Sequence, residues 1–194
     1  MRIHVRLALT SRLFILDNME ELNPLQYPIG KFSAPEVITP ELRAEWIGII
    51  SDLPGQLADL LANVDENLLE KPYREGGWSA RKVIHHLYDS HINSYIRFKM
   101  ALTEDNPTIK PYDENTWAEM PDGNEAPFQW SIEGIKYIHL RWVYLMKTMQ
   151  ESDWSKTYFH PERGITYRLD RVLGIYAWHC VHHLKHIQAV VVGR

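Results

Sequence analysis

The chain has 194 residues, of which 45% are hydrophobic and 24% charged, a length that suits one compact domain and is short for two. Its formal net charge of −4 is spread along the sequence without a long basic block, which argues against nucleic acid as a partner. The single cysteine, Cys180, cannot form an intramolecular disulfide, so we expect a cytoplasmic protein stabilised by packing. The unusual feature of the composition is its ten histidines.

The first 18 residues place basic side chains ahead of an apolar stretch, which superficially suggests a secretory signal or a membrane span. Ser11 and Arg12 interrupt the apolar run, and each part is far shorter than the roughly 20 residues that cross a bilayer. No small-residue cleavage site follows. We therefore expect no membrane segment. Because an ordinary acidic start follows at Met19, we expect residues 1–25 to be a dispensable extension and residues 26–194 to form the domain.

The first helix is expected after a proline-rich, extended lead-in over residues 20–40. Thr39 followed by Pro40 reads as an N-cap with proline at the first helical position. Apolar residues then recur at steps of three and four, which predicts an amphipathic helix ending near Val64. Pro54 is expected to kink it.

Three further long helices are expected. A linker over residues 65–77 leads to Ser79, which caps a second helix running to about Leu102. A loop with one short helical turn at 114–119 follows. A third helix begins between Phe128 and Ser131 and reaches about Met149, with Ile135, Ile138, Leu140, Trp142, Leu145 and Met149 on one face. Residues 156–169 predict a short hairpin, and a last helix covers about 170–192. The chain is therefore predicted to be an all-α helical bundle with one hairpin-like excursion.

Four histidines of the last helix lie within one short stretch, WHCVHHLKHI. His179 and His183 are one turn and roughly 40° apart, so their imidazoles can converge on one ion. His182 and His186 have the same spacing. The apolar residues of the helix centre nearer the first pair, which we expect to point inward, with the second pair on the flank or behind the ligands. The residues used for that comparison are Val172, Tyr176, Ile187, Val190 and Val191.

The second helix carries a polar stripe at the edge of its apolar face: His86, Ser90, Asn93 and Arg97. Such a stripe ending in a cation is typical of a pocket between helices, because a structural helix would use Leu or Ala there. His85 is rotated by about 100° and is expected to face outward near Asp89.

Histidines that stand alone on a helix are usually structural or surface residues, so we assign no function to His91, His139 or His160. Two inward histidines one turn apart need partners, which a shared metal supplies. From the residues alone, a metal site and a structural pair both stay open. Trp46 and Trp142 are interpreted as packing residues.

Several motifs taken together resemble the DinB-like proteins, specifically the YfiT-type metal-dependent hydrolases. The motifs are GGWSARKVIHHLYDSH with NSYIRFKMALTEDNPTIKPYDENTWAE, and YAWHCVHHLKHI in the last helix; YPIGKF and PYREGGWS are similar as well. The resemblance covers roughly residues 26–192 in order. It departs from the family only in the N-terminal extension.

This resemblance implies an up-down-down-up four-helix bundle with one divalent metal on three histidines. Matched residue by residue, the ligands are His86, His179 and His183. The family pattern of Trp-His, two variable positions and His-His is met from Trp178 to His183. Family members commonly form homodimers, and related members are S-transferases that use low-molecular-weight thiols such as bacillithiol or mycothiol.

Three neutral imidazoles leave open positions on an ion, as in catalytic sites. Such an ion can activate water or hold a small thiol as thiolate. Zinc fits best, while nickel, manganese or iron also stay open. Arg97, with Asn93 and Ser90, is the candidate site for an anionic small-molecule substrate; no general base is assigned. We therefore expect a metal-dependent hydrolase, with a thiol S-transferase or a non-catalytic, metal-stabilised stress-response bundle as alternatives.

Overall fold

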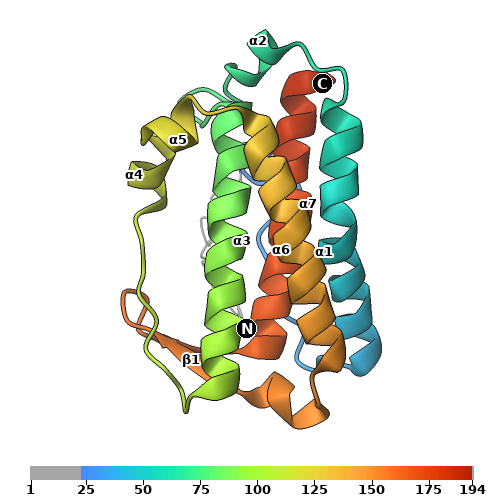
Figure 1. Ribbon diagram of the computed structural model, residues 1–194, viewed down its shortest axis with the longest axis vertical. Coiled ribbons are helices and arrows are strands. Elements are labelled where there is room, and N and C mark those ends of the chain that lie inside the picture. The colour runs from blue at the N-terminus through green and yellow to red at the C-terminus, as the bar shows by residue number, and fades with distance from the viewer. Residues whose placement is uncertain (1–22, 194) are drawn as a thin grey trace, which may run out of the picture.

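The computed structural model describes residues 23–193, and four long helices dominate it (Figure 1). They are α1 (Pro40–Leu61), α3 (Ala80–Thr103), α6 (Phe128–Thr148) and α7 (Leu169–Val191). The shorter elements are α2 (Glu66–Leu69), α4 (Glu114–Ala118), α5 (Pro121–Asn124), the 3-10 helix η1 (Glu151–Ser155), and strands β1 (Thr157–His160) and β2 (Ile165–Arg168). The predicted four helices and the hairpin are confirmed, each helix end lying within a few residues of its predicted position.

The long helices run up, down, down and up in chain order, as the colours of Figure 1 show. Both α1 and α3 pack against α6 and α7, so the two consecutive helices α1 and α3 occupy opposite corners of the bundle. A long crossover, residues 104–127, returns the chain from the foot of α3 to the top of α6. The expected up-down-down-up topology is confirmed.

Capping residues set the starts of α1 and α3 as predicted. The Thr39 hydroxyl accepts a hydrogen bond from the Leu42 amide, and the Ser79 hydroxyl accepts one from the Lys82 amide, both at 3.3 Å. These side chains satisfy amides that have no partner within the helix. The α-helix continues through Pro54 to Leu61.

Two features of the sequence interpretation were incomplete or wrong. The region predicted as linker contains α2, and α5 follows α4 in the crossover. Leu140, placed on the core face of the third helix, is 62% exposed, whereas Trp142, Val143 and Met146 are buried. Because α6 packs against both α1 and α3, its buried arc is centred on those residues and leaves Leu140 outside.

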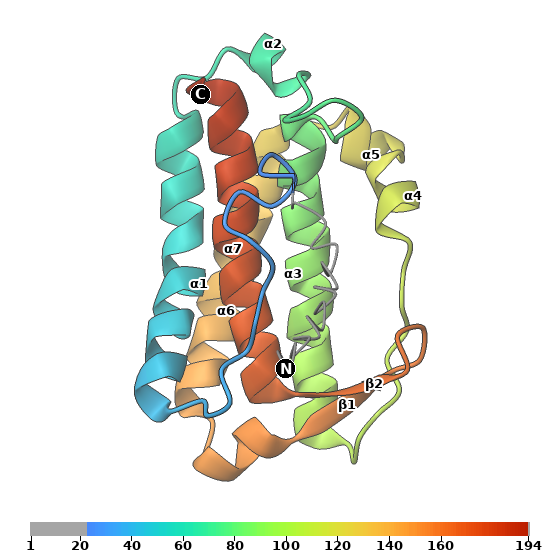
Figure 2. The same cartoon turned by 180° about the vertical axis from the view of Figure 1, so that it is seen from behind.

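The lead-in, residues 23–39, runs along α7 before α1 begins (Figure 2). The Trp178 indole N–H donates to the Gly30 carbonyl at 3.1 Å. Gly174 allows this close approach, since a Cβ there would lie 2.8 Å from the Trp46 ring and 2.9 Å from Phe32. The predicted extension falls mostly on residues 1–22, outside the described residues.

The crossover and the hairpin together form a wall beside α3. Helices α4 and α5 pack on α3, and the β1–β2 hairpin reaches toward the crossover (Figures 1 and 2). Tyr158 pairs with Tyr167 in the antiparallel register, and Phe159 forms a parallel bridge to Thr108 of the crossover. Within residues 23–193, no helix is both long and apolar enough to cross a membrane.

Candidate metal centre

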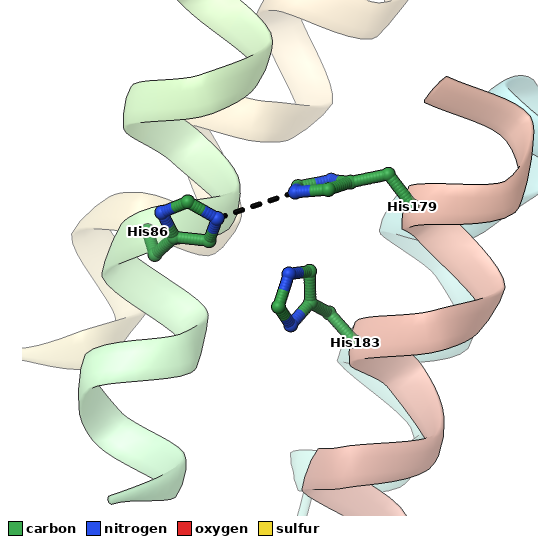
Figure 3. Close-up of side chains that lie close together, drawn as sticks. All are labelled: His86, His179 and His183. Atoms are coloured by element: carbon green, nitrogen blue, oxygen red, sulfur yellow. Dashed lines mark hydrogen bonds between the residues drawn. The ribbon is translucent and has the colours of Figure 1, made fainter. Parts of the chain in front are cut away.

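Three histidines from two helices converge between α3 and α7 (Figure 3). His86 of α3 and His179 and His183 of α7 each offer a ring nitrogen, and these nitrogens lie within 4.8 Å of one another. The Nε2 atoms of His86 and His179 are 3.2 Å apart. The structure thus brings together the three side chains predicted as ligands; we call them the histidine triad.

Burial keeps the triad uncharged at neutral pH. Removal from water lowers the pKa of His86 to about 4, and it lowers the pKa of both His179 and His183 well below the ordinary value of histidine. Neighbouring imidazoles lower the latter two further. Each ring therefore has a nitrogen lone pair available without first losing a proton.

The donor set fits a divalent ion. Two nitrogens bound about 2.0–2.1 Å from one ion lie roughly 3.0–3.4 Å apart, and the His86 to His179 separation of 3.2 Å matches that range. In a metal-free protein the same separation permits an N–H···N hydrogen bond between the rings. Three imidazoles without a carboxylate or thiolate suit zinc, nickel or a related transition metal.

His179 is supported from behind by two histidines to which the sequence interpretation assigned no function. His179 Nδ1 lies 3.1 Å from Nε2 of His91, and His91 Nδ1 lies 2.7 Å from Nε2 of His139. His139 Nδ1 in turn lies 2.6 Å from the backbone carbonyl oxygen of Ile50. Both added histidines are almost completely buried. The sequence shows only that each of these two histidines stands alone on a helix, and this does not reveal which side chain it contacts.

His183 is supported differently. Its Nδ1 lies 3.3 Å from Nδ1 of His186, which leaves Nε2 on the side of the other triad rings (Figure 3). His186 stacks on Tyr73 with ring centroids 3.9 Å apart, and His182 stacks on Trp178 at 4.2 Å. These positions agree with the expectation that the second histidine pair lies behind or beside the first.

His85 does not face outward, contrary to the expectation from its helix position. It is buried, its Nδ1 lies 2.7 Å from the Ser131 hydroxyl, and its Nε2 lies 3.1 Å from the Ala126 carbonyl. The turn that leads into α6 covers this face of α3, so a position rotated by 100° from the core is still enclosed.

A cavity of about 370 Å³ adjoins the triad, and His179 forms part of its wall. Ser90 and Arg97 of the predicted polar stripe line it, together with Arg163 from the hairpin. Ser90 is buried and its hydroxyl donates to the Tyr176 hydroxyl at 3.3 Å. Asn93, however, is not among the lining residues, because its side-chain amide turns back to donate to the Asp89 carbonyl at 2.8 Å.

A second, smaller cleft of about 250 Å³ also borders the triad. His183 lines it, along with His182 and His186 and residues of the 73–78 loop. Asn115 of α4 lines both cavities. The triad therefore borders two open spaces, one lined by residues of the hairpin and one lined by residues of the 73–78 loop.

The fold and the site define a class: a four-helix bundle whose facing helices hold a cluster of neutral histidines. The family model described as the DinB superfamily matches residues 49–187. The chain therefore belongs to the DinB superfamily.

Several known proteins are similar in sequence to this one over most of its length. Relatives from Bacillus cereus and Bacillus mycoides are 48% and 47% identical over 169 residues, which is 87% of this chain and 96% of each relative, and both carry the name "Putative metal-dependent hydrolase". The solved structure of YfiT from Bacillus subtilis, described as a probable metal-dependent hydrolase with an unusual four-helix bundle topology, is 39% identical, with a TM-score of 0.84 over 86% of this chain and 95% of that one. A mycothiol-dependent maleylpyruvate isomerase, 18% identical with a TM-score of 0.61 over 77% of this chain and 62% of that one, shares the fold.

Proposed function

We propose that this chain is a metal-dependent hydrolase that holds one divalent ion, zinc in the first instance, on His86, His179 and His183. The observation that carries the proposal is that three neutral imidazoles converge at the wall of an open cavity. The names given to relatives that match 87% of the chain support it. An ion held by three such ligands supplies Lewis-acid chemistry and lowers the pKa of water toward 7.

The cavity beside the triad supplies the groups that would hold a substrate. Arg97 and Arg163 bring two cations to it, and Asp113, Glu114 and Glu162 line it as well. Guanidinium groups match carboxylate and phosphate oxygens. In the described part of the chain, Arg97 makes a hydrogen bond at 3.4 Å to the Lys110 carbonyl and pairs with no carboxylate. Its charge is therefore available to an anionic group of a small molecule.

His160 adds a further polar group to this cavity. It is buried, lies at the end of β1, and lines the same wall as the two arginines. Among residues 23–193, no group hydrogen-bonds to its Nδ1. Because a buried polar atom without a partner is costly, this nitrogen is suited to a hydrogen bond with a bound substrate.

A thiol S-transferase is the second candidate function, and the two cavities favour it over a purely structural role. One cavity is lined by His179 and the other by His183, so two small molecules can approach the triad through separate cavities. A transferase needs room for a thiol and an electrophile. A non-catalytic bundle, the third reading, needs neither space.

An activity screen of zinc-loaded protein separates these functions. Esters, amides and other electrophiles, with and without an anionic group, are each incubated with and without a low-molecular-weight thiol. A hydrolase releases product without thiol. A transferase forms product only when thiol is present: a thioester, with release of the alcohol or amine, from an acyl substrate, or a thioether, with release of the leaving group, from an alkylating one. Absence of turnover in both arms, with zinc bound, would support the non-catalytic bundle. The expected homodimer and cytoplasmic location stay predictions.

A further inference from the structure

A continuous line of short contacts joins the triad to the backbone of α1. It runs from His179 of α7 to His91 of α3, then to His139 of α6, and ends on the Ile50 carbonyl of α1, with separations of 3.1, 2.7 and 2.6 Å. All four long helices contribute one member. The line lies inside the bundle, where His91 and His139 are at most 1% exposed.

The Ile50 carbonyl lacks its usual partner within the helix, because the residue four positions later is a proline. In a regular α-helix the Ile50 carbonyl would accept a hydrogen bond from the amide of residue 54. That residue is Pro54, inside α1, which has no amide hydrogen and whose ring crowds the carbonyl of the preceding turn. The Ile50 carbonyl is therefore left for another donor, and His139 occupies that place.

The end point fixes the direction of every hydrogen bond in the line. A carbonyl only accepts, so His139 Nδ1 must carry a hydrogen, and the Nε2 of a neutral His139 must then accept. His91 consequently donates from Nδ1 and accepts at Nε2. His179 must then donate from Nδ1, which leaves a lone pair on its Nε2. That Nε2 is the atom that faces His86.

We propose that Pro54, His139 and His91 form a relay that fixes the ring orientation and tautomer of His179 and presets its Nε2 lone pair for the metal. His91 and His139 are positioning residues in this account, since neither reaches the triad's ligand atoms. The proposal rests on the proposed function in that it takes His179 as a ligand. It adds that the ligand is prepared before any metal binds.

The tautomers can be measured directly in the metal-free protein. Long-range ¹H–¹⁵N NMR correlations of the imidazole rings, assigned with single histidine variants, distinguish Nδ1–H from Nε2–H. We expect His139, His91 and His179 all to be Nδ1–H, with slow exchange of the His91 and His139 hydrogens with water. An Nε2–H form or an even mixture at His179 would overturn the proposal. This measurement on the unmodified protein does not depend on any variant folding.

Variants then test whether the relay matters for the ion. His91→Phe keeps a ring but removes the acceptor, and loss of an outer partner of a ligating histidine typically weakens metal binding 10–100-fold. We expect that loss in the zinc dissociation constant, measured by competition with a chromophoric chelator. His91→Gln retains an acceptor oxygen and should lose less. Pro54→Ala, which restores an amide able to compete for Ile50, should speed exchange of the His139 Nδ1 hydrogen.

His85→Gln is the matched control. His85 is also buried on α3 and makes two hydrogen bonds, but neither goes to the triad or the relay. It should change zinc affinity by less than about threefold. Equal zinc affinity in folded His91→Phe and unmodified protein would overturn the proposal. If unmodified protein shows the three expected tautomers but binds no zinc, the proposed function fails while the hydrogen-bond relay stands.

Discussion

The two α7 histidines of the triad are one helical turn apart and yet have different surroundings. His179 faces the interior and is supported by His91 and His139, which connect it to the backbone of α1. His183 is supported by His186, on its own helix, and lines a cleft beneath the 73–78 loop. One ligand is thus braced by three other helices, while the other is held within its own helix, and each of them lines an open space.

The difference arises from what lies opposite each turn of α7. The His179 turn meets α3 and, beyond it, α6, so polar atoms there find their partners among other buried groups. The His183 turn instead borders irregular chain, since the cleft that His183 lines is formed with residues of the lead-in and the 73–78 loop. A catalytic ion needs both a fixed orientation for its ligands and access for a substrate. The His179 turn provides the firmer orientation, and both turns border an open space.

The largest expected effect comes from removing a triad histidine. His86→Ala, His179→Ala and His183→Ala should each lose most bound metal, because two imidazoles do not hold a divalent ion as three do. The matched control is His182→Ala, on the same turn as His183, which should retain most of it. Metal analysis of purified, folded variants checks this. Full occupancy in His183→Ala, or loss only in His182→Ala, would mean that the other histidine pair binds the ion.

The two supports can be compared by removing the histidine that contacts each α7 ligand from behind. His91→Phe should weaken zinc binding 10–100-fold, whereas His186→Phe should weaken it only several-fold, because the longer 3.3 Å contact holds His183 less firmly. Zinc dissociation constants of the two variants, measured side by side, decide the point. A larger loss in His186→Phe would reverse our assignment of the braced side.

Acid should destabilise the metal-free protein through its buried histidines. Burial lowers the pKa of His139 to about 4, below the unfolded value of about 6.5. The unfolded state therefore binds the extra proton between these values, so stability is full above pH 6.5 and falls as pH decreases toward 4. Each such histidine contributes a slope of at most about 1.4 kcal/mol per pH unit.

Urea unfolding at several pH values between 7.5 and 4.5 tests this slope. His139→Gln should be less stable overall but show a shallower dependence on pH than the unmodified protein. His160→Gln serves as the control, since His160 lines an open cavity and is less deeply buried than His139, although burial lowers its pKa as well. An identical slope in His139→Gln and unmodified protein would show that His139 is not kept neutral by the fold.

The last expected change concerns the cavity beside His179, which Arg97 lines. Arg97→Leu should leave metal content unchanged and raise KM for anionic substrates about 10–100-fold, the loss expected for a charge-assisted hydrogen bond. Arg141→Leu, which removes an arginine placed over Tyr95, is the control. If Arg97→Leu instead lowers the melting temperature strongly with unchanged activity per folded molecule, Arg97 is a structural residue.

The sequence predicted the bundle well because caps and apolar periodicity are local signals. Thr39 and Ser79 begin helices by bonding amides three residues away, and those contacts need no knowledge of the rest of the fold. The spacing of His179 and His183 was likewise a property of one helix. Helix length, order and the inward histidine pair could all be obtained in this way.

Residues whose partners lie on another helix or loop could not be predicted from the sequence. His85 is enclosed by the turn before α6. The role that we propose for His91 depends on its contact with His139, which lies on another helix. From the sequence alone, Pro54 predicts a kink in the first helix. In the structure, Pro54 cannot donate to the Ile50 carbonyl, which His139 contacts instead. A helical wheel shows which way a side chain points but not what it meets there, so contacts between helices require the structure.

X-ray absorption spectroscopy of the zinc-loaded protein shows directly whether the triad binds the ion. We expect three imidazole nitrogens at about 2.0–2.1 Å from the zinc, a count that falls in His86→Ala and stays at three in His182→Ala. The ion would then be held between α3 and α7 by the triad. A sulfur ligand from Cys180, or three imidazoles retained in His86→Ala, would contradict it.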